Sequence, residues 1–528
     1  MGTFMTVTVL ATTDMHGYVY PHDYFTRRPA ARGLAAAATL IDEARRENPN
    51  ALLLDCGDTI QGSPLASVYQ AARRGGRTSA PEPMMLAMSR VGYDAMVMGN
   101  HELDHGLASL GAARASSSFP WLSANTRSTG VVPSFAPYLL KVVGGVKVAV
   151  IGITTPAIPQ WAKEENIAGL TFLDPVESVR RALLKLEAEK PDVILAAVHG
   201  GLGRDAETGA ARSHELPGEN PVWELAERFP QLAAILYGHS HQREPGRRIG
   251  GVLVAQPRSL AMDVARVDLT LERDPGNGRF RLASATSRLL AVTPETKPDP
   301  QVLELARRYH EAAERDLDTR VAETPVALDG ARSRFEDSAL VEAIHEAQLH
   351  YAKAEVSLTA LSQTGVAIPP GPVTRRELAA LYVHDDELYA VEGDGRMVRE
   401  ALENATRYFR GWSEASDGSG PVVDTAIPDY NYATAQGVDY EIDLTQPVGS
   451  RVRNLRYRGA PLRDDEPLRI ALSSYRAAGS AGYSMFRGAK VVYRSGRAIR
   501  DLLAEYWGAR GHLPEKPDDN WRLLPRAA

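Results

Sequence analysis

The sequence contains a single cysteine, Cys56, which excludes both a disulfide within the chain and a zinc site built from cysteines. No stretch approaches the roughly 18 consecutive apolar residues of a membrane-spanning helix. The first residues, MGTFMT, have neither the basic start nor the apolar core of a signal peptide. These absences predict a cytoplasmic protein, or an extracytoplasmic one if a leader was removed. Cys56 lies in an apolar run and is predicted to be an ordinary buried thiol.

The sequence also lacks an excess of positive charge. Lys and Arg number 60 against 66 Asp and Glu, so the net charge is −6 and the pI is about 6.2. Binding the phosphate backbone of a nucleic acid requires a concentrated basic face, so a nucleic-acid polymer is not expected as the main partner. Small anions stay compatible with this charge, because a bound metal ion can supply positive charge locally.

A chain of 528 residues is too long for one ordinary core, so we expect at least two domains. In the first half, continuous apolar strands alternate with helices, which indicates an α/β fold with a sheet covered on both faces. The predicted strands are 6–12, 51–54, 95–98, 146–155, 192–198 and 232–237, and the predicted helices are 34–46, 84–91, 175–190 and 220–228.

Five of these strands run directly into Asp, Asn or His, mostly beside glycine. The strand ends read Asp14-Met15-His16-Gly17, Gly57-Asp58, Gly99-Asn100-His101, His199-Gly200-Gly201 and Gly238-His239-Ser240-His241. One such residue at a strand end is usually a cap or a core residue, but five coincidences are not expected. The glycines allow sharp turns and a close approach of the backbone to a bound oxyanion.

The strand ends together supply seven oxygen and nitrogen ligands: Asp14, His16, Asp58, Asn100, His199, His239 and His241. A single metal would leave about three of them unused, whereas two divalent ions that share one bridging carboxylate would use them all. Two metals at this spacing are suited to an in-line displacement at phosphorus. The mixed Asp, Asn and His set does not distinguish Mn, Zn, Fe and Co.

The stretch after the strand 95–98 combines two kinds of chemistry. Asn100 offers a neutral oxygen to a metal, His101 places an imidazole beside it, and Asp104 provides a carboxylate that can orient that imidazole. In contrast, Glu219 and Asn220 precede a predicted helix, and for this pair a capping role is the expected one.

Beyond residue 252 the predicted strands become shorter, and an amphipathic helix begins near Pro298. We predict a catalytic domain over 1–297, a linker helix over 298–323 and a C-terminal domain over 324–528. The C-terminal half alternates helices and short strands, and none of its predicted strands ends in the Asp or His pattern described above.

Five motifs in this order resemble those of the 5′-nucleotidase family of calcineurin-like metallophosphoesterases. They are Thr13-Asp14-Met15-His16-Gly17, the Gly57 to Leu65 stretch GDTIQGSPL, Gly99-Asn100-His101-Glu102, His199-Gly200-Gly201 and Gly238-His239-Ser240-His241. The resemblance covers nearly the whole chain. It implies a four-layer α/β metallophosphoesterase sandwich, followed by a C-terminal α/β substrate-binding domain of the 5′-nucleotidase type.

The resemblance also implies a role for each residue of the motifs. One metal would be held by Asp14, His16, Asp58 and His241, and the other by Asp58, Asn100, His199 and His239, with Asp58 as the bridge. His101 would lie beside the scissile phosphate and assist the leaving oxygen, while Asp104 would orient its ring.

Within the family, the segments 430–444 and 474–479 look most like the 2′,3′-cyclic-nucleotide 2′-phosphodiesterase/3′-nucleotidase branch. Tyr432 and Tyr475 match the two aromatic residues that stack on the base, and Asn431 is a candidate for a polar contact to it. The Gly-Gly-x-Arg loop of dedicated 5′-nucleotidases corresponds to 361–366, LSQTGV, which lacks the Arg.

The predicted function is therefore dimetal-dependent hydrolysis of 2′,3′-cyclic nucleotides and 3′-nucleotides. The alternatives are a 5′-nucleotidase or nucleotide-sugar hydrolase, and an inactive nucleotide-binding protein that keeps the fold. The expected partner is a small nucleotide, with no membrane, and the sequence does not indicate an oligomeric state. Because the metals and the base pocket fall in different domains, we expect a domain rotation to bring substrate to metal.

Overall fold

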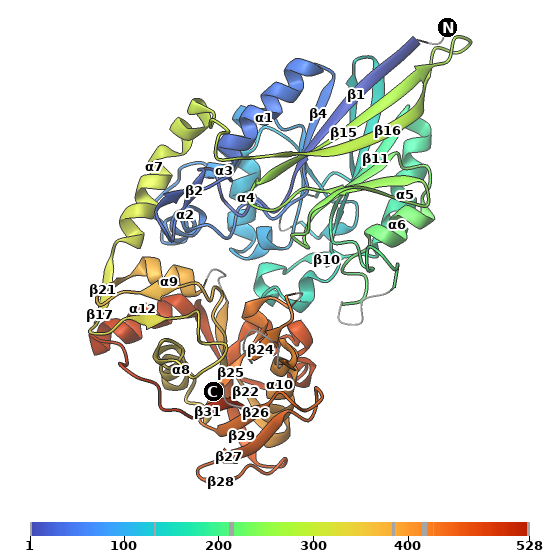
Figure 1. The fold of residues 1–528 in the computed structure, drawn as a ribbon. Helices are drawn as coiled ribbons and strands as arrows, with labels where there is room; N and C mark the ends of the chain where they lie inside the picture. The colour runs from blue at the N-terminus through green and yellow to red at the C-terminus, as the bar shows by residue number, and fades with distance from the viewer. Residues whose placement is uncertain are drawn as a thin grey trace. The chain divides into compact units, whose positions relative to one another are not determined.

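The computed structural model describes residues 3–130, 132, 134–210, 216–382, 386–413, 420–425 and 427–524. The chain forms two compact units, Met1–Glu314 and Arg315–Ala528, called unit 1 and unit 2 below. In Figure 1, unit 1 runs from blue to yellow-green and unit 2 from yellow to red. Each unit is described by itself.

The first sheet of unit 1 has the strand order β16-β15-β1-β4-β5-β6. Its strands are β1 (Thr3–Thr12), β4 (Ala51–Asp55), β5 (Ala95–Val97), β6 (Trp121–Leu122), β15 (Asp263–Arg273) and β16 (Phe280–Ala291). The strands β1, β4, β5 and β6 are parallel, with Thr12 opposite Asp55 and Asp55 opposite Met96. The carboxyl ends of β1, β4 and β5 therefore lie level, and the loops after them start side by side.

The second sheet of unit 1 has the order β13-β14-β12-β11-β9-β8. Its strands are β8 (Tyr138–Val143), β9 (Val146–Thr154), β11 (Val193–His199), β12 (Ala234–Tyr237), β13 (Glu244–Ile249) and β14 (Val252–Gln256). The inner four strands are parallel, and Val198 lies opposite Tyr237. His199 and Gly238 therefore leave the sheet at neighbouring positions.

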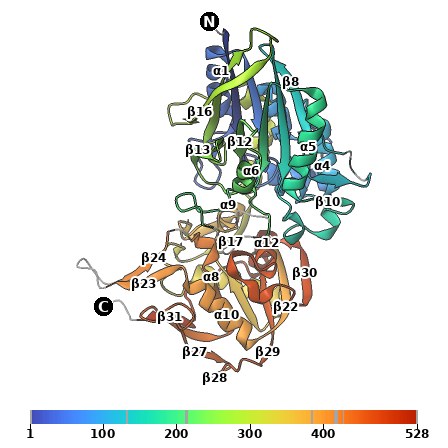
Figure 2. The same cartoon turned by 90° about the vertical axis from the view of Figure 1, so that its right-hand side faces the viewer.

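The two sheets pack face to face and are covered by helices on their outer faces. Between them lies a core that contains Val9, Leu54, Val150 and Leu195, together with the buried thiol of Cys56. The helices α1 (Leu34–Glu47), α3 (Pro83–Val91) and α4 (Leu107–Ser116) cover the first sheet, and α5 (Pro175–Glu189) and α6 (Val222–Arg228) cover the second. Figures 1 and 2 show these layers from two sides. The predicted four-layer sandwich and the predicted buried thiol are confirmed.

Smaller elements of unit 1 surround the carboxyl ends of the strands. They are β2 (His22–Asp23), β3 (Arg28–Pro29), α2 (Pro64–Arg74), β7 (Thr126–Ser128), β10 (Leu170–Phe172) and the short 3₁₀ turns η1 (His101–Leu103), η2 (Ile158–Gln160) and η3 (Glu164–Asn166). The long helix α7 (Pro300–Leu317) begins where the sequence predicted, and its Val302 and Ala306 join the core of unit 1.

Unit 2 is built on a five-stranded and a four-stranded sheet. The first has the order β25 (Thr434–Gln436), β19 (Val356–Thr359), β29 (Pro467–Ser473), β22 (Glu387–Asp394) and β30 (Val491–Ala498), and the second has β28 (Ala460–Pro461), β27 (Val452–Tyr457), β26 (Asp439–Asp443) and β31 (Trp521–Leu524). Its helices are α8 (Ala339–Ala352), α9 (Arg375–Leu381), α10 (Gly395–Thr406), α11 (Ser474–Ala477) and α12 (Ile499–Arg510). The core includes Leu358, Leu402, Tyr432 and Ile470.

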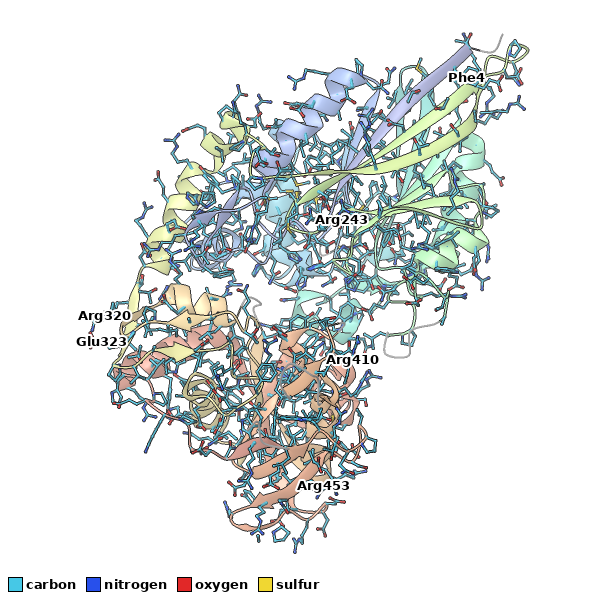
Figure 3. The ribbon with its side chains drawn as sticks, in the orientation of Figure 1. Phe4, Arg243, Arg320, Glu323, Arg410 and Arg453 are labelled. Carbon is cyan, nitrogen blue, oxygen red and sulfur yellow. The ribbon has the colours of Figure 1, made fainter. Side chains whose placement is uncertain are left out.

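Short strand pairs complete unit 2. They are β17 (Arg320–Thr324) with β21 (Gly371–Thr374), β18 (Leu328–Asp329) with β20 (Ala367–Ile368), and β23 (Phe409–Ser413) with β24 (Gly420–Val423), and the turns are η4 (Asp429–Asn431), η5 (Ser480–Gly482) and η6 (Ser484–Phe486). Across the described part of the chain, no helix combines the length and the apolar character needed to cross a bilayer. Among the apolar side chains, Phe4 near the outer end of β1 is exposed (Figure 3).

Candidate active site

The carboxyl ends of five strands, three from the first sheet and two from the second, bring the seven predicted ligands together. Asp14, His16 and His241 form one group, and Asp58, His199 and His239 form another, with the donor atoms of each group within 4.8 Å of one another. The amide oxygen of Asn100 lies 3.0 Å from Nε2 of His199, which adds it to the second group. All seven residues thus lie at one edge of the sandwich.

The loops that carry these side chains have an unusual backbone. Asp14, His16, Asp58, His239 and His241 all have positive φ angles, between 48° and 72°, a region that residues other than glycine rarely adopt. Two glycines make these turns possible: a Cβ on Gly99 would lie 2.2 Å from Oδ1 of Asp58, and one on Gly238 would lie 1.8 Å from Oγ1 of Thr13. The strain is concentrated where the predicted ligands converge.

The hydrogen bonds of the histidines determine which ring nitrogen points inward. Nδ1 of His16 lies 3.0 Å from the carbonyl of Gln61, and Nδ1 of His199 lies 2.8 Å from the carbonyl of Cys56. A carbonyl can only accept, so Nδ1 is the donor in both rings and Nε2 is directed into the site. This arrangement, a backbone acceptor behind the ring, is the usual support of a metal-binding histidine.

In the first group, His241 lies beside both a second histidine and a carboxylate. Nε2 of His241 lies 3.0 Å from Nε2 of His16 and 3.5 Å from Oδ1 of Asp14, and burial lowers the pKa of His16 to about 3. Burial also lowers the pKa of His241, but the contact with Asp14 outweighs it and raises that pKa. His241 thus lies between the ring of His16 and the carboxylate of Asp14. The donor set fits a divalent metal ion.

In the second group, too, a histidine lies beside a carboxylate. Nε2 of His199 lies 3.1 Å from Oδ2 of Asp58. Burial lowers the pKa of His199, but the charge of Asp58 outweighs it and raises the pKa to about 9. The pKa of Asp58 in turn lies well below its usual value, because His199 and His101 outweigh the effect of burial.

His101 lies beside the second group and not within it. Its backbone N–H donates to Oδ1 of Asp58 at 2.8 Å, and its Nε2 lies 3.9 Å from Oδ2 of the same residue. Nδ1 donates to Oδ2 of Asp104 at 2.7 Å, and the side chain of Asn166 holds the carbonyl of Asp104 at 2.9 Å. Burial lowers the pKa of His101, but Asp104 and Asp58 raise it to about 10. His101 is therefore an imidazolium with its Nε2–H directed toward the centre.

In unit 2, the structure affects which aromatic residues are candidates for stacking on a base. Tyr432 is 4% exposed and belongs to the core, where it stacks on Tyr408 with 5.2 Å between ring centroids and meets Phe409 and Trp521 edge to face. Little of its ring surface is therefore open to a base, although the sequence predicted that Tyr432 stacks on one. Tyr430, two residues earlier, is 39% exposed.

The remaining two predicted residues of unit 2 are Asn431, which follows Tyr430, and Tyr475. Tyr475 lies half-buried on α11, and the buried guanidinium of Arg476 next to it donates to the carbonyl of Tyr430 at 2.7 Å. Arg476 thus links the segment of Tyr430 to the helix of Tyr475. The side-chain oxygen of Asn431 is buried and has no hydrogen-bond partner among the described residues.

Comparisons with known proteins agree with the two-unit division. Residues 7–243 match the calcineurin-like phosphoesterase family, and residues 320–488 match the C-terminal domain of 5′-nucleotidases. The chain belongs to the 5′-nucleotidase family of calcineurin-like metallophosphoesterases. This confirms the family resemblance of the sequence motifs. Membership in this family implies an enzyme that cleaves phosphoesters with divalent metal ions.

Individual members of the family resemble the chain at moderate identity. The 2′,3′-cyclic-nucleotide 2′-phosphodiesterase/3′-nucleotidase of Haemophilus influenzae is 27% identical, over 98% of this chain and 87% of that protein. The trifunctional nucleotide phosphoesterase YfkN of Bacillus subtilis is also 27% identical over 98% of this chain, which spans only 39% of that longer protein. The crystal structure of a putative 5′-nucleotidase of Staphylococcus aureus in complex with α-ketoglutarate is 26% identical and has a TM-score of 0.83, over 98% of this chain and 100% of that one.

Two acidic residues at this metallophosphoesterase centre were not identified from the sequence. The first is Glu102, which is fully buried and accepts hydrogen bonds from the backbone N–H groups of Asp58, Thr59, Ile60 and Gly99 at 2.6 to 3.3 Å. A single carboxylate therefore shapes both the loop of Asp58 and the turn before Asn100. Its position directly after His101 is the only sequence signal for this role.

The second is Glu219, for which the predicted capping role is wrong. The helix α6 begins after Pro221 with no side-chain cap, while Oε1 of Glu219 lies 3.1 Å from Nε2 of His239. Asn220 accepts from the backbone N–H of Gly201 at 2.6 Å, so it too supports a strand end and not the helix. The ring of Trp161, from the turn after η2, lies 5.5 Å from that of His239.

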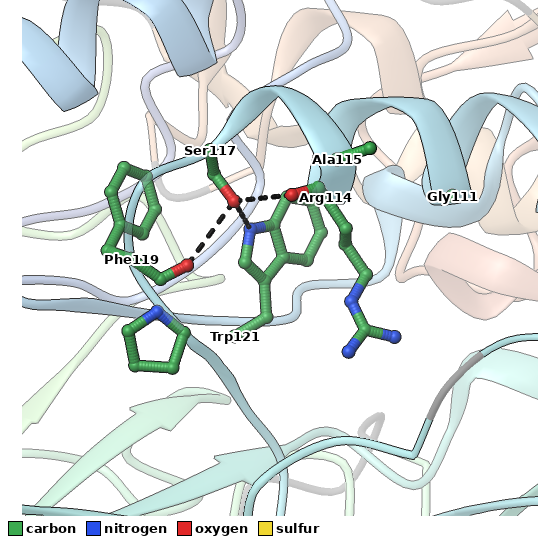
Figure 4. Close-up of a pocket in the computed structure, with 7 residues that line it drawn as sticks. Gly111, Arg114, Ala115, Ser117, Phe119 and Trp121 are labelled. Carbon is green, nitrogen blue, oxygen red and sulfur yellow. Dashed lines mark hydrogen bonds between the residues drawn. The ribbon is translucent and has the colours of Figure 1, made fainter.

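A surface cavity of about 310 Å³ lies away from this centre, between α4 and the start of β6 (Figure 4). Ser117 accepts from Nε1 of Trp121 at 3.1 Å and donates to the carbonyls of Arg114 and Phe119. The cavity lies at the amino end of β6, whereas the candidate ligands lie at the carboxyl ends of the parallel strands.

Arg243 and Arg258 both pair with the buried carboxylate of Asp263, at 3.1 and 2.7 Å. These pairs attach the segment after His241 to the start of β15. Figure 3 labels Arg243 on the ribbon of unit 1.

Proposed function

We propose that the protein hydrolyses 2′,3′-cyclic nucleotides to 3′-nucleotides and then removes the 3′-phosphate, at two divalent metal ions in unit 1. The observation that carries this proposal is the pairing of two converging ligand groups with a separate, charged His101–Asp104 pair. Ligands alone would support metal binding, whereas a proton donor beside them supports chemistry at an ester oxygen.

The two metal positions follow the two side-chain groups. Asp14, His16 and His241 would hold one ion, Asn100, His199 and His239 the other, and Asp58 would bridge them. When bound, two divalent ions supply Lewis-acid chemistry, since they activate water as a nucleophile and balance charge that develops on a phosphoryl group.

The residues of the chain supply the proton for the leaving group. In the first step, the oxygen of water forms a bond to phosphorus and releases a proton to solvent while the bond from phosphorus to the ribose 2′-oxygen breaks. Nε2 of His101 gives its proton to that 2′-oxygen, and Asp104 holds the ring through Nδ1 and keeps it charged beforehand. His101 takes up a proton from solvent before the second step. In the second step, water displaces the 3′-oxygen from phosphorus in the same way, which releases inorganic phosphate.

Unit 2 would bind the nucleoside part of the substrate. We propose Tyr430 in place of Tyr432 as one stacking residue, with Tyr475 as the other and Asn431 as a polar contact to the base. Every base has a π-face on which an aromatic ring can stack, so we expect the enzyme to accept nucleotides with different bases. The absence of Arg from 361–366 favours cyclic and 3′-nucleotides over 5′-nucleotides.

The alternative within the family is a 5′-nucleotidase or nucleotide-sugar hydrolase. It is favoured by the similarity to the putative 5′-nucleotidase of Staphylococcus aureus. The test is a panel of 2′,3′-cyclic AMP, 3′-AMP, 5′-AMP and UDP-glucose with Mn²⁺. The highest kcat/KM is expected for the first two, and a preference for the last two would reject the cyclic-nucleotide assignment.

The alternative from another class is an inactive protein that binds nucleotides. Turnover of any substrate in the panel that stops on addition of EDTA and returns with Mn²⁺ would exclude it. Nucleotide binding without turnover, at all four substrates, would support it.

A further inference from the structure

The ring of His239 is held from several sides. Oε1 of Glu219 lies 3.1 Å from Nε2, the indole of Trp161 lies against the ring at 5.5 Å between centroids, and the ring of His199 meets it edge to face at 5.1 Å. The backbone of His239 has φ of 72°, and its N–H donates to Oδ2 of Asp14 at 3.0 Å. A backbone in this region persists only where the surroundings determine it, so the orientation of the ring is set by its neighbours.

The contact with Glu219 determines the tautomer of this ring. A carboxylate only accepts hydrogen bonds, so Nε2 of His239 is the donor to Glu219, and Nδ1 is the nitrogen left for a metal ion. His16 and His199 have the opposite arrangement, because their Nδ1 atoms donate to the carbonyls of Gln61 and Cys56. Among these three histidines, His239 is therefore the one with a charged acceptor behind its ring.

We propose that Glu219 is a positioning residue that holds His239 with Nδ1, and not Nε2, toward the metal centre. This inference rests on the proposed metal-binding role of His239. The carboxylate also makes Nδ1 a stronger donor, since partial transfer of the Nε2 proton increases the electron density of the ring.

Glu219 is itself held in place by its loop. Its Oε2 accepts from the backbone N–H of Leu216 at 3.0 Å, and the side chain of the next residue, Asn220, accepts from the N–H of Gly201. The same short segment therefore supports the strand end that carries His199 and the ring of His239. This arrangement explains the structural role of Glu219 and Asn220, whereas helix capping does not.

The test compares two variants with a control. Glu219→Leu removes the acceptor at similar volume, whereas Glu219→Gln removes the charge and keeps an oxygen that can accept from Nε2–H. Glu224→Leu is the control, because Glu224 lies on the adjacent helix α6 and pairs only at the surface with Arg228. Each metal-free protein is titrated with Mn²⁺ by calorimetry, and its thermal unfolding is measured before metal is added.

We expect wild type and Glu224→Leu to bind two Mn²⁺ ions. Glu219→Leu should weaken one of the two sites by about 10 to 100-fold and leave the other within about twofold, and Glu219→Gln should recover part of the loss. A ¹⁵N spectrum of histidine-labelled, metal-free protein should show the His239 ring with a protonated Nε2, and this ring should become a mixture of tautomers in Glu219→Leu.

Two results would overturn the inference. One is unchanged affinity at both sites in Glu219→Leu. The other is an equal loss at both sites together with a lower midpoint of thermal unfolding, which would mean that Glu219 only stabilises its loop. If wild type itself bound fewer than two Mn²⁺ ions, the proposed dimetal function would fail instead, so the two failures are distinguishable.

Discussion

The predicted site residues of unit 1 and unit 2 differ in how well the amino-acid type of a residue predicts where it lies in the fold. In unit 1, the structure brings all seven predicted ligands to one edge of the sandwich. In unit 2, it places Tyr432 in the core and leaves Tyr430 at the surface.

The difference arises from side-chain chemistry. An Asp or His at the end of an apolar strand cannot be buried without a partner at acceptable cost, so such residues gather where partners exist. A tyrosine is compatible with both a core and a binding cleft, so its type alone does not distinguish the two.

The largest effect is expected from Asp58→Ala, which removes the proposed bridge of the unit 1 site. Both metal positions should weaken together, and kcat should fall by more than the roughly 10⁴-fold upper range for loss of a general acid. Metal content by mass spectrometry and kcat on 2′,3′-cyclic AMP measure this. The control is Asp42→Ala, an exposed carboxylate on α1. Full metal content in Asp58→Ala would contradict a bridging role.

The next effect separates proton transfer from metal binding within unit 1. His101→Ala should keep both metals and lose about 10² to 10⁴-fold in kcat. Asp104→Asn should lose less, because the ring stays in place but its charge is less favoured. Metal content and kcat are measured on the same preparations. Retained activity in His101→Ala would mean that another group protonates the leaving oxygen.

The raised pKa of His199 predicts a pH dependence of metal binding. The pKa of His199 is raised to about 9, so its ring is protonated below that pH and a metal ion must displace the proton. Affinity at this position should therefore fall about tenfold for each unit below pH 9 and level off above it. Calorimetry in buffers of different ionisation enthalpy counts the released protons. An affinity independent of pH between 7 and 9 would contradict this account.

A matched pair of substitutions tests the contrast within unit 2. Tyr430→Ala should raise KM for 3′-AMP by about 10 to 100-fold, equivalent to the roughly 1–3 kcal/mol of a stacked base. It should leave hydrolysis of bis(p-nitrophenyl) phosphate, which has no nucleoside, nearly unchanged. Tyr432→Ala should instead lower the free energy of unfolding by about 3–5 kcal/mol, as for other large buried aromatic residues. The reverse result would return the stacking role to Tyr432.

The smallest effect is expected from Tyr432→Phe. The hydroxyl of Tyr432 is buried and has no hydrogen-bond partner among the described residues, so its removal leaves no partner unpaired. The free energy of unfolding should change by less than about 1 kcal/mol, and KM for 3′-AMP should not change. A large rise in KM would show that this hydroxyl contacts the substrate.

The sequence by itself determined the α/β sandwich of unit 1, the residues that converge at its edge and the family. These follow from local signals: apolar strands, glycines at their ends, and Asp and His side chains that do not belong in a core. The parallel order of β1, β4 and β5 then brings the strand ends to the same edge.

Only the tertiary structure decided how the convergent residues are held. The three hydrogen bonds from the loop of Asp58 to Glu102 and the contact of Glu219 with His239 join segments 20 to 44 residues apart. The burial of Tyr432 against Tyr408 and Trp521 depends on side chains that lie near it only after folding. Such contacts have no local pattern, because packing and hydrogen bonding depend on distance in space and not along the chain.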